Sequence, residues 1–180
     1  YQRFWVGNYT GIGVMDANTG FYIDPAKVSG IYGEPVFSSC LSGDGSIWFG
    51  GEDKLYHIVT GPQGMIRSEK IALPVAPKQQ VKAIVFDAKG IMWAGIKNAG
   101  LLRYDPAAKT FFLFKGTNDL FSTVPVSALC AARRDTLLIG TKGAGLLIMD
   151  TRTEKMNALQ FDKAQPSDYL IINAIYCDKK

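Results

Sequence analysis

One phrase of fourteen residues occurs twice in this 180-residue chain. Residues 92–105 read MWAGIKNAGLLRYD and residues 137–150 read LLIGTKGAGLLIMD, with seven identical positions. A fixed period of this length indicates repeated structural units that pack against one another. The aromatic-x-Gly triplet inside the phrase recurs at intervals of 43, 45 and 45 residues, at Trp5, Trp48, Trp93 and, with leucine in place of the aromatic, Leu138.

The same order of segments surrounds each triplet. An alternating apolar run precedes it, a polar turn separates the two, and a turn, glycine-bearing in most copies, leads on to two further apolar runs. The runs are rich in β-branched and aromatic residues with a period of two, which predicts strands. The predicted first strands are residues 36–41, 81–86, 126–131 and 172–177.

Four short antiparallel strands in each repeat are typical of a β-propeller blade. One blade alone cannot bury both faces of its sheet, so neighbouring blades must stack, with the tryptophans between them. We therefore predict an all-β fold: a β-propeller segment of about four blade equivalents that is part of a larger propeller. The predicted boundaries are a partial blade at 1–35, blades at 36–80, 81–125 and 126–171, and the first strand of a further blade at 172–180.

Composition and charge argue against several classes of protein. The net charge is +4, but the basic residues are scattered and no basic run alternates with aromatics, so we expect no nucleic-acid partner. No apolar run reaches the ~20 residues of a membrane span, so we expect no direct insertion of this segment. A single histidine and three dispersed cysteines argue against a metal site and a disulfide framework, and we predict no cofactor.

Residues 81–105 follow the pattern V-x-A-I-x-x-D-x-x-G-x-x-W-x-G-x-x-x-x-G-L-x-x-Y-D. This pattern resembles the repeat of two-component regulator propellers. The next copy keeps much of this pattern but has Leu138 in the tryptophan position, and the copy around Trp48 loses the Gly-Leu pair. With four copies in register, the resemblance covers nearly the whole chain.

This resemblance implies a setting for the chain. Such repeats are typical of the periplasmic sensor half of hybrid two-component systems of the Bacteroidetes type, which precedes a membrane span, a histidine kinase and a response regulator. The signals are usually glycan breakdown products. The chain itself shows no kinase, receiver domain or membrane helix, so we expect an excerpt whose partners are the remaining blades of the same propeller. The alternative is that a second copy closes the ring.

Several conspicuous residues have structural interpretations. Asp16, Asp105 and Asp150 close equivalent strands, and we interpret them as caps of the following turns, since a catalytic pair would not recur in every repeat. His57 has no nucleophile motif beside it, so we interpret it as a packing or surface residue. We interpret Cys40, Cys130 and Cys177 as small buried hydrophobic residues, because other repeats have apolar residues there.

Ligand-binding residues are expected where the repeats differ, because packing fixes the positions that recur. In a propeller, the turns between second and third strands share one face with the connections between blades. Aromatic and polar side chains gathered there suit a sugar, and two lysines would favour an acidic glycan. The predicted ligand-binding residues are Tyr9, Tyr32, Glu52, Lys97, Asn98, Phe121 and Lys142, with Asp53, Gln80 and Tyr169 beside them.

We interpret the chain as a non-enzymatic propeller segment that binds, or supports binding of, an oligosaccharide or other glycan-derived signal. The alternatives are a propeller enzyme acting on polysaccharide as a lyase or hydrolase, and a protein-interaction propeller. An enzyme would need a singular cluster of His, Arg, Tyr or carboxylate groups at the channel mouth. An interaction platform would show large apolar loop residues and no affinity for sugars.

The division into packing and loop positions predicts unequal effects of mutation. Trp93→Ala should lower the free energy of unfolding by roughly 3–5 kcal/mol, because it removes a large buried side chain. Lys97→Ala should change it by less than ~0.5 kcal/mol. Urea unfolding of both variants measures the difference, and equal losses would contradict the division.

Overall fold

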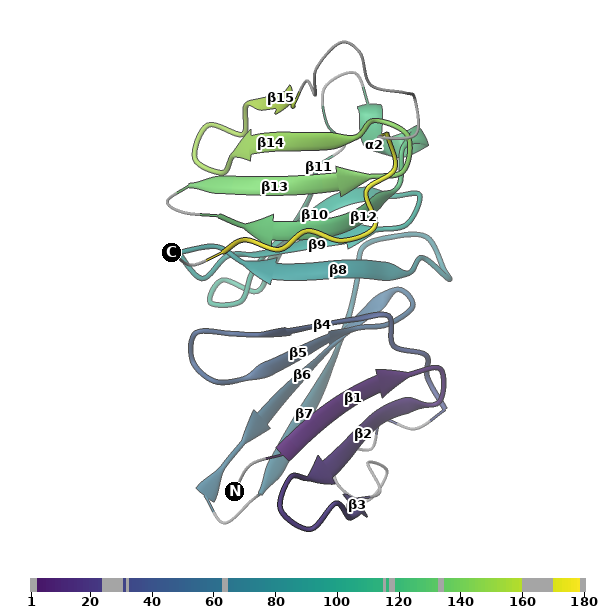
Figure 1. Ribbon diagram of the computed structural model, residues 1–180, viewed down its shortest axis with the longest axis vertical. Coiled ribbons are helices and arrows are strands. Elements are labelled where there is room, and N and C mark those ends of the chain that lie inside the picture. Colours follow the sequence, from purple (N-terminus) through teal and green to yellow (C-terminus); the bar gives the residue numbers. More distant parts are fainter. Residues whose placement is uncertain are drawn as a thin grey trace. The chain divides into compact units, whose positions relative to one another are not determined.

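The computed structural model describes residues 3–23, 31, 33–62, 65–114, 116, 119–132, 135–159 and 170–178. The chain forms two compact units, Tyr1–Val81 and Lys82–Lys180, which we describe separately. Both are built from antiparallel sheets whose strands follow one another in chain order (Figure 1). Tyr32 and Tyr169, two of the predicted ligand contacts, lie outside the described residues.

The first unit contains a three-stranded and a four-stranded sheet. The three-stranded sheet consists of β1 (Arg3–Asn8), β2 (Gly11–Asp16) and β3 (Tyr22–Ile23). The four-stranded sheet consists of β4 (Ser38–Leu41), β5 (Ile47–Gly50), β6 (Lys54–Thr60) and β7 (Ile66–Ala72).

The second unit contains two four-stranded sheets and a one-turn helix, α2 (Leu120–Thr123), which lies between them in the chain. The first sheet consists of β8 (Val81–Phe86), β9 (Met92–Ile96), β10 (Gly100–Asp105) and β11 (Thr110–Phe114). The second consists of β12 (Val126–Ala131), β13 (Thr136–Thr141), β14 (Leu146–Asp150) and β15 (Met156–Ala158). The predicted all-β propeller fold, with four antiparallel strands in a blade, is confirmed.

A glycine in each second strand packs directly against a β-branched residue of the segment that begins the next repeat. A Cβ atom on Gly95 would lie 2.5 Å from Val126 Cγ1, and one on Gly140 would lie 2.7 Å from Ile172 Cγ2. Such distances are too short for any real Cβ, so only glycine lets the two segments approach this closely. The first unit repeats the arrangement at Gly7 and Val36, and again at Gly50 and Val81, the last residue of that unit.

The core of the second unit lies between its two sheets. Trp93 on β9 is 1% exposed and packs in one cluster with Val126 and Leu129 of β12 and with Ile139 of β13. The cluster also contains apolar residues of β10 and β14, so the facing sides of both sheets contribute. This is the stacking of neighbouring sheets that the repeated tryptophans predicted.

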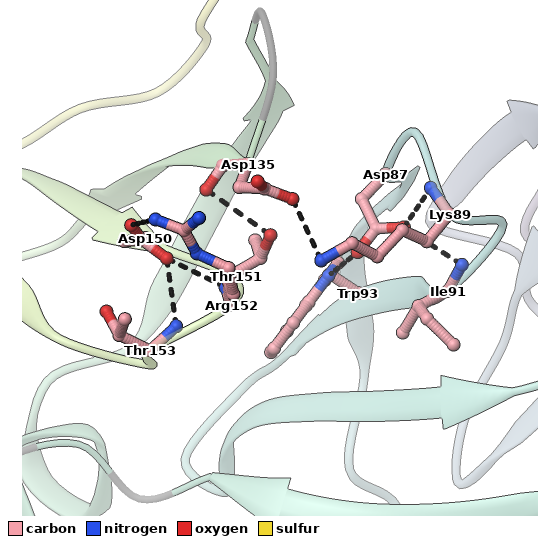
Figure 2. Close-up of polar contacts among 9 residues, drawn as sticks. All are labelled: Asp87, Lys89, Ile91, Trp93, Asp135, Asp150, Thr151, Arg152 and Thr153. Carbon is pink, nitrogen blue, oxygen red and sulfur yellow. Dashed lines mark hydrogen bonds and ion pairs between the residues drawn. The ribbon is translucent and has the colours of Figure 1, made fainter.

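Each buried tryptophan has a hydrogen-bond acceptor for its ring N–H. Trp93 Nε1 donates to Asp87 Oδ2 at 3.1 Å, while the other carboxylate oxygen of Asp87 accepts the backbone N–H groups of the turn (Figure 2). Trp48 Nε1 donates to Ser46 Oγ at 3.1 Å. A buried polar group needs such a partner, so a repeat with a tryptophan at the position of Trp93 needs an acceptor such as Asp87. Leu138 has no ring N–H, and its repeat lacks that aspartate.

The turn between second and third strands explains why the repeat around Trp48 departs from the pattern. Gly100 and Gly145 have φ of 100° and 69°, in the left-handed region that glycine adopts without strain. The turn is shorter in the repeat around Trp48, and there Asp53 takes the left-handed conformation with φ of 49°. The Gly-Leu pair is therefore lost while β6 remains a full strand.

The end of the described chain differs from the prediction in two ways. Residues 172–177 form no strand, because within the described part no neighbouring segment offers them a ladder of hydrogen bonds. Instead, the segment is held at Ile172, whose N–H donates to Thr141 and whose carbonyl accepts the Ser127 hydroxyl. Cys177 forms a disulfide with Cys130, so our interpretation of these two cysteines as separate apolar residues was wrong. Cys40 is not in a disulfide.

The glycine contact can be tested by adding a single methyl group. Gly95→Ala should lower the free energy of unfolding by roughly 1–3 kcal/mol, because the new Cβ overlaps Val126 and forces the strands apart. Gly43→Ala is the control, since a Cβ there meets nothing within 4 Å. Chemical denaturation that gives the same loss for both variants would contradict a role for close packing at Gly95.

Candidate functional site

The aspartates that close the third strands cap turns, as predicted. Asp150 Oδ1 accepts the backbone N–H groups of Arg152 and Thr153 at 2.8 and 2.9 Å (Figure 2). Asp16 and Asp105 accept the equivalent pairs of N–H groups in their own repeats. These backbone hydrogen bonds lower the pKa of Asp16 and Asp150. Their carboxylates are thus occupied within the turn.

His57 has the packing role that the sequence predicted. Its ring stacks on Trp48, with centroids 4.1 Å apart and planes at 16°. Burial lowers the pKa of His57, although Asp44 and Glu69 act in the opposite direction. Its Nε2 atom is buried without a hydrogen-bond partner. Within the described ranges, no three His, Cys, Asp or Glu side chains gather closely enough to hold a metal ion.

The turns between second and third strands and the connections between sheets meet at one end of each sheet. In the first unit, Glu52 forms a β-bridge with Gln80. In the second unit, Lys142 bridges Ile171, and its N–H donates to the carbonyl of Pro125. One position at this end recurs in every repeat, two residues after the glycine of the second strand. It is occupied by Tyr9, Glu52, Lys97 and Lys142. We call this end of the sheets the mouth end.

An exposed tyrosine and a half-buried phenylalanine lie together at the mouth end of the first unit. Tyr9 is 80% exposed and meets Phe37 edge to face, with ring centroids 5.9 Å apart. Phe37 also lines a pocket of about 120 Å³, which is smaller than the range typical of ligand pockets. The other residues that line the pocket are Gly7, Val36, Ser38, Ser39 and Phe49.

A cluster centred on Glu34 was not predicted. Its carboxylate accepts hydrogen bonds from the hydroxyl of Tyr56 and from Lys70 Nζ, the latter at 2.9 Å, and Lys54 Nζ lies 3.4 Å away. These contacts lower the pKa of Glu34 to about 2, with the Tyr56 hydrogen bond as the largest cause. Burial and the carboxylate raise the pKa of the Tyr56 hydroxyl, so Tyr56 is held in its neutral form. The cluster ties the connection before β4 to strands β6 and β7.

The predicted contacts in the second unit fall into three groups. Lys97 and Lys142 are exposed at the mouth end. Asn98 is also exposed, but its φ of 59° gives it a turn-forming role besides any ligand contact. Phe121 is 0% exposed and packs in the core with Phe114, so it has no surface for a ligand and we withdraw it from the site.

The Glu34 cluster predicts a loss of stability at low pH. The pKa of Glu34 is lowered on folding from near 4.5 to about 2, so its stabilising effect is complete above pH 4.5 and disappears as the pH falls toward 2. Glu34→Gln should cost about 1 kcal/mol at neutral pH, with the difference from wild type shrinking below pH 4.5. Tyr56→Phe should weaken the same dependence. Urea unfolding curves that stay equally spaced from pH 7 to pH 2 would contradict this account.

No protein-family model and no curated protein matches the sequence, and no helix in the described residues is long and apolar enough to cross a membrane. Solved structures do share its fold. Two structures of the extracellular domain of BT4673 from B. thetaiotaomicron, described as a one-component and as a hybrid two-component system, match 98% of this chain. Both have a TM-score of 0.77, with 20% and 19% sequence identity.

Two further propellers match less of the chain. The Dos1 propeller and the WD40 repeats of RRP9 cover 86% of it, each with a TM-score of 0.62, at 16% and 15% identity. The chain spans 24% of the length of the BT4673 domains and 43% and 46% of the two propellers. It therefore has the fold of a β-propeller segment, and it shares this fold over nearly its whole length with the extracellular domain of a protein described as a two-component system.

Proposed function

We propose that the chain is part of the ligand-sensing propeller in the periplasmic region of a hybrid two-component regulator. It binds, or supports the binding of, a glycan-derived oligosaccharide, and the signal passes to a membrane-linked histidine kinase. The observation that carries this proposal is the match of 98% of the chain to the extracellular domain of BT4673, together with the resemblance of the repeat. At 20% identity the match establishes the fold, and the function is our inference from it.

The disulfide supports a location outside the cytoplasm. Disulfides form and persist in oxidising compartments such as the bacterial periplasm, whereas the cytosol keeps thiols reduced. The Cys130–Cys177 bond joins β12 to a segment that follows the last strand of its sheet. Its presence agrees with the periplasmic placement that the proposal requires.

The mouth end of the first unit offers the chemistry that a sugar needs. An exposed tyrosine ring presents a flat apolar face on which the C–H groups of a sugar can stack. Tyr9 provides such a ring, and Phe37 supports it from the side. Glu52 and Gln80, at the same end of the unit, supply groups that hydrogen-bond to sugar hydroxyls.

Calorimetric titration of the intact protein with a panel of neutral and acidic oligosaccharides tests the proposal. We expect at least one to bind, and Tyr9→Ala to weaken that binding roughly tenfold, equivalent to about 1.4 kcal/mol. Tyr176→Ala is the matched control, because Tyr176 is 88% exposed and lies in the segment that follows the last sheet.

Two outcomes would overturn the proposal. Failure of every oligosaccharide to bind would exclude glycan sensing and favour a protein-interaction propeller. Release of shortened or unsaturated products from polysaccharide, detected by mass spectrometry, would show that the protein is an enzyme.

A further inference from the structure

Three lysines lie at the mouth end of the second unit. Lys82 is the second residue of β8, and Lys97 directly follows β9, its neighbour in the sheet. The two strands are joined by a tight turn in which Asp87 N–H donates to the carbonyl of Ile91. The start of β8 therefore lies beside the end of β9, which brings Lys82 and Lys97 to the same end of this sheet.

The third lysine reaches the same place from the neighbouring sheet. Gly95, near the end of β9, packs against Val126 at the start of β12. Val126 pairs in turn with Thr141, the last residue of β13. Lys142 follows Thr141, and its backbone N–H donates to Pro125 O at 3.0 Å. The glycine contact that joins the sheets thus also brings Lys142 toward the other two lysines.

The ion pairs that the structure shows in the second unit lie away from the mouth end. The ion pairs Lys89–Asp135, Arg103–Glu154 and Arg152–Asp150 all include a residue of the turns at the opposite end. In the part of the chain that the structure describes, neither Lys97 nor Lys142 forms an ion pair. Burial lowers the pKa of Lys82, and the charges that add to this effect are Lys97 and Lys142.

The repeat itself does not require lysine at these places. At the position of Lys97 and Lys142, the repeats of the first unit have Tyr9 and Glu52. At the position of Lys82, the neighbouring first strands have Phe37 and Ser127. Like charges near one another repel, and an anion bound at the exposed Lys97 and Lys142 relieves that repulsion.

We propose that Lys82, Lys97 and Lys142 form a binding site for the anionic group of an acidic oligosaccharide, either a uronate carboxylate or a sulfate ester. This inference rests on the proposed function and specifies its ligand class. Lysine ammonium groups serve as point charges for such anions, and two of the three are exposed to an arriving ligand. Lys82, which is partly buried, would add a third positive charge near the anion.

The test compares acidic and neutral ligands on the intact protein. Calorimetry is run with uronic-acid oligosaccharides, with sulfated oligosaccharides and with the carboxyl-reduced, neutral forms of the uronic-acid set. The double variant K97Q/K142Q should weaken binding of an acidic oligosaccharide at least tenfold and leave neutral ones unchanged. Lys155→Gln is the matched control, because it removes one exposed lysine charge beyond the turn that follows β14, at the opposite end of the sheet.

Inorganic sulfate, tested by thermal shift, separates this inference from the proposed function. Sulfate should raise the melting temperature of wild type and of Lys155→Gln, but not that of K97Q/K142Q. This result supports the anion site even if no glycan binds. In that case the proposed function fails while the anion site stands. Binding of neutral oligosaccharides alone, unaffected by the double variant, overturns the anion site and leaves glycan sensing in place. Absence of any lysine-dependent binding, with sulfate or with acidic oligosaccharides, also overturns the anion site.

Discussion

The close contact between a glycine in one sheet and a β-branched residue at the start of the next repeat is the constraint on which the rest of the fold depends. At Gly95 and Gly140 a hydrogen atom occupies the space that any other side chain would fill, so the segment that begins the next repeat can lie directly against the second strand. This spacing lets Trp93 reach the apolar residues of the facing sheet. Because a four-stranded sheet has two faces to bury, the same contact must recur in every repeat, and this requirement accounts for the period of the sequence.

Other recurring residues depend on one another through single hydrogen bonds. Burying an indole brings a polar N–H into an apolar region, and Asp87 accepts it while also closing the turn before β9. In the repeat around Trp48, Ser46 accepts the indole N–H, and Asp44 in turn accepts from Ser46. Replacement of the tryptophan by Leu138 removes the need for an acceptor. A degenerate repeat is therefore a consistent change of coupled residues and not a random loss of pattern.

Local properties of the sequence predicted much of the fold. The alternation of apolar residues predicted the strands and the buried Trp93, and turn chemistry predicted the capping role of Asp105. Predictions failed where distant contacts decide the outcome. Phe121 resembled an exposed loop aromatic, but the single turn of α2 directs it into the core. The Glu34–Tyr56 hydrogen bond joins residues 22 positions apart and has no motif. Cys177 was interpreted as a buried apolar residue from its aligned position in a predicted strand. That alignment does not apply, because residues 172–177 form no strand. The remaining ligand contacts stay predictions, because loop residues differ from one repeat to the next.

The disulfide determines which part of the chain can carry mechanical load. It closes residues 130–177 into a covalent loop that contains β13, β14 and β15. Tension applied beyond Cys177 passes through the sulfur bridge to β12 and bypasses the residues inside the loop. A pull along the backbone therefore cannot extend that blade while the bridge is intact, and the strain falls on the contacts between β12 and the sheet before it.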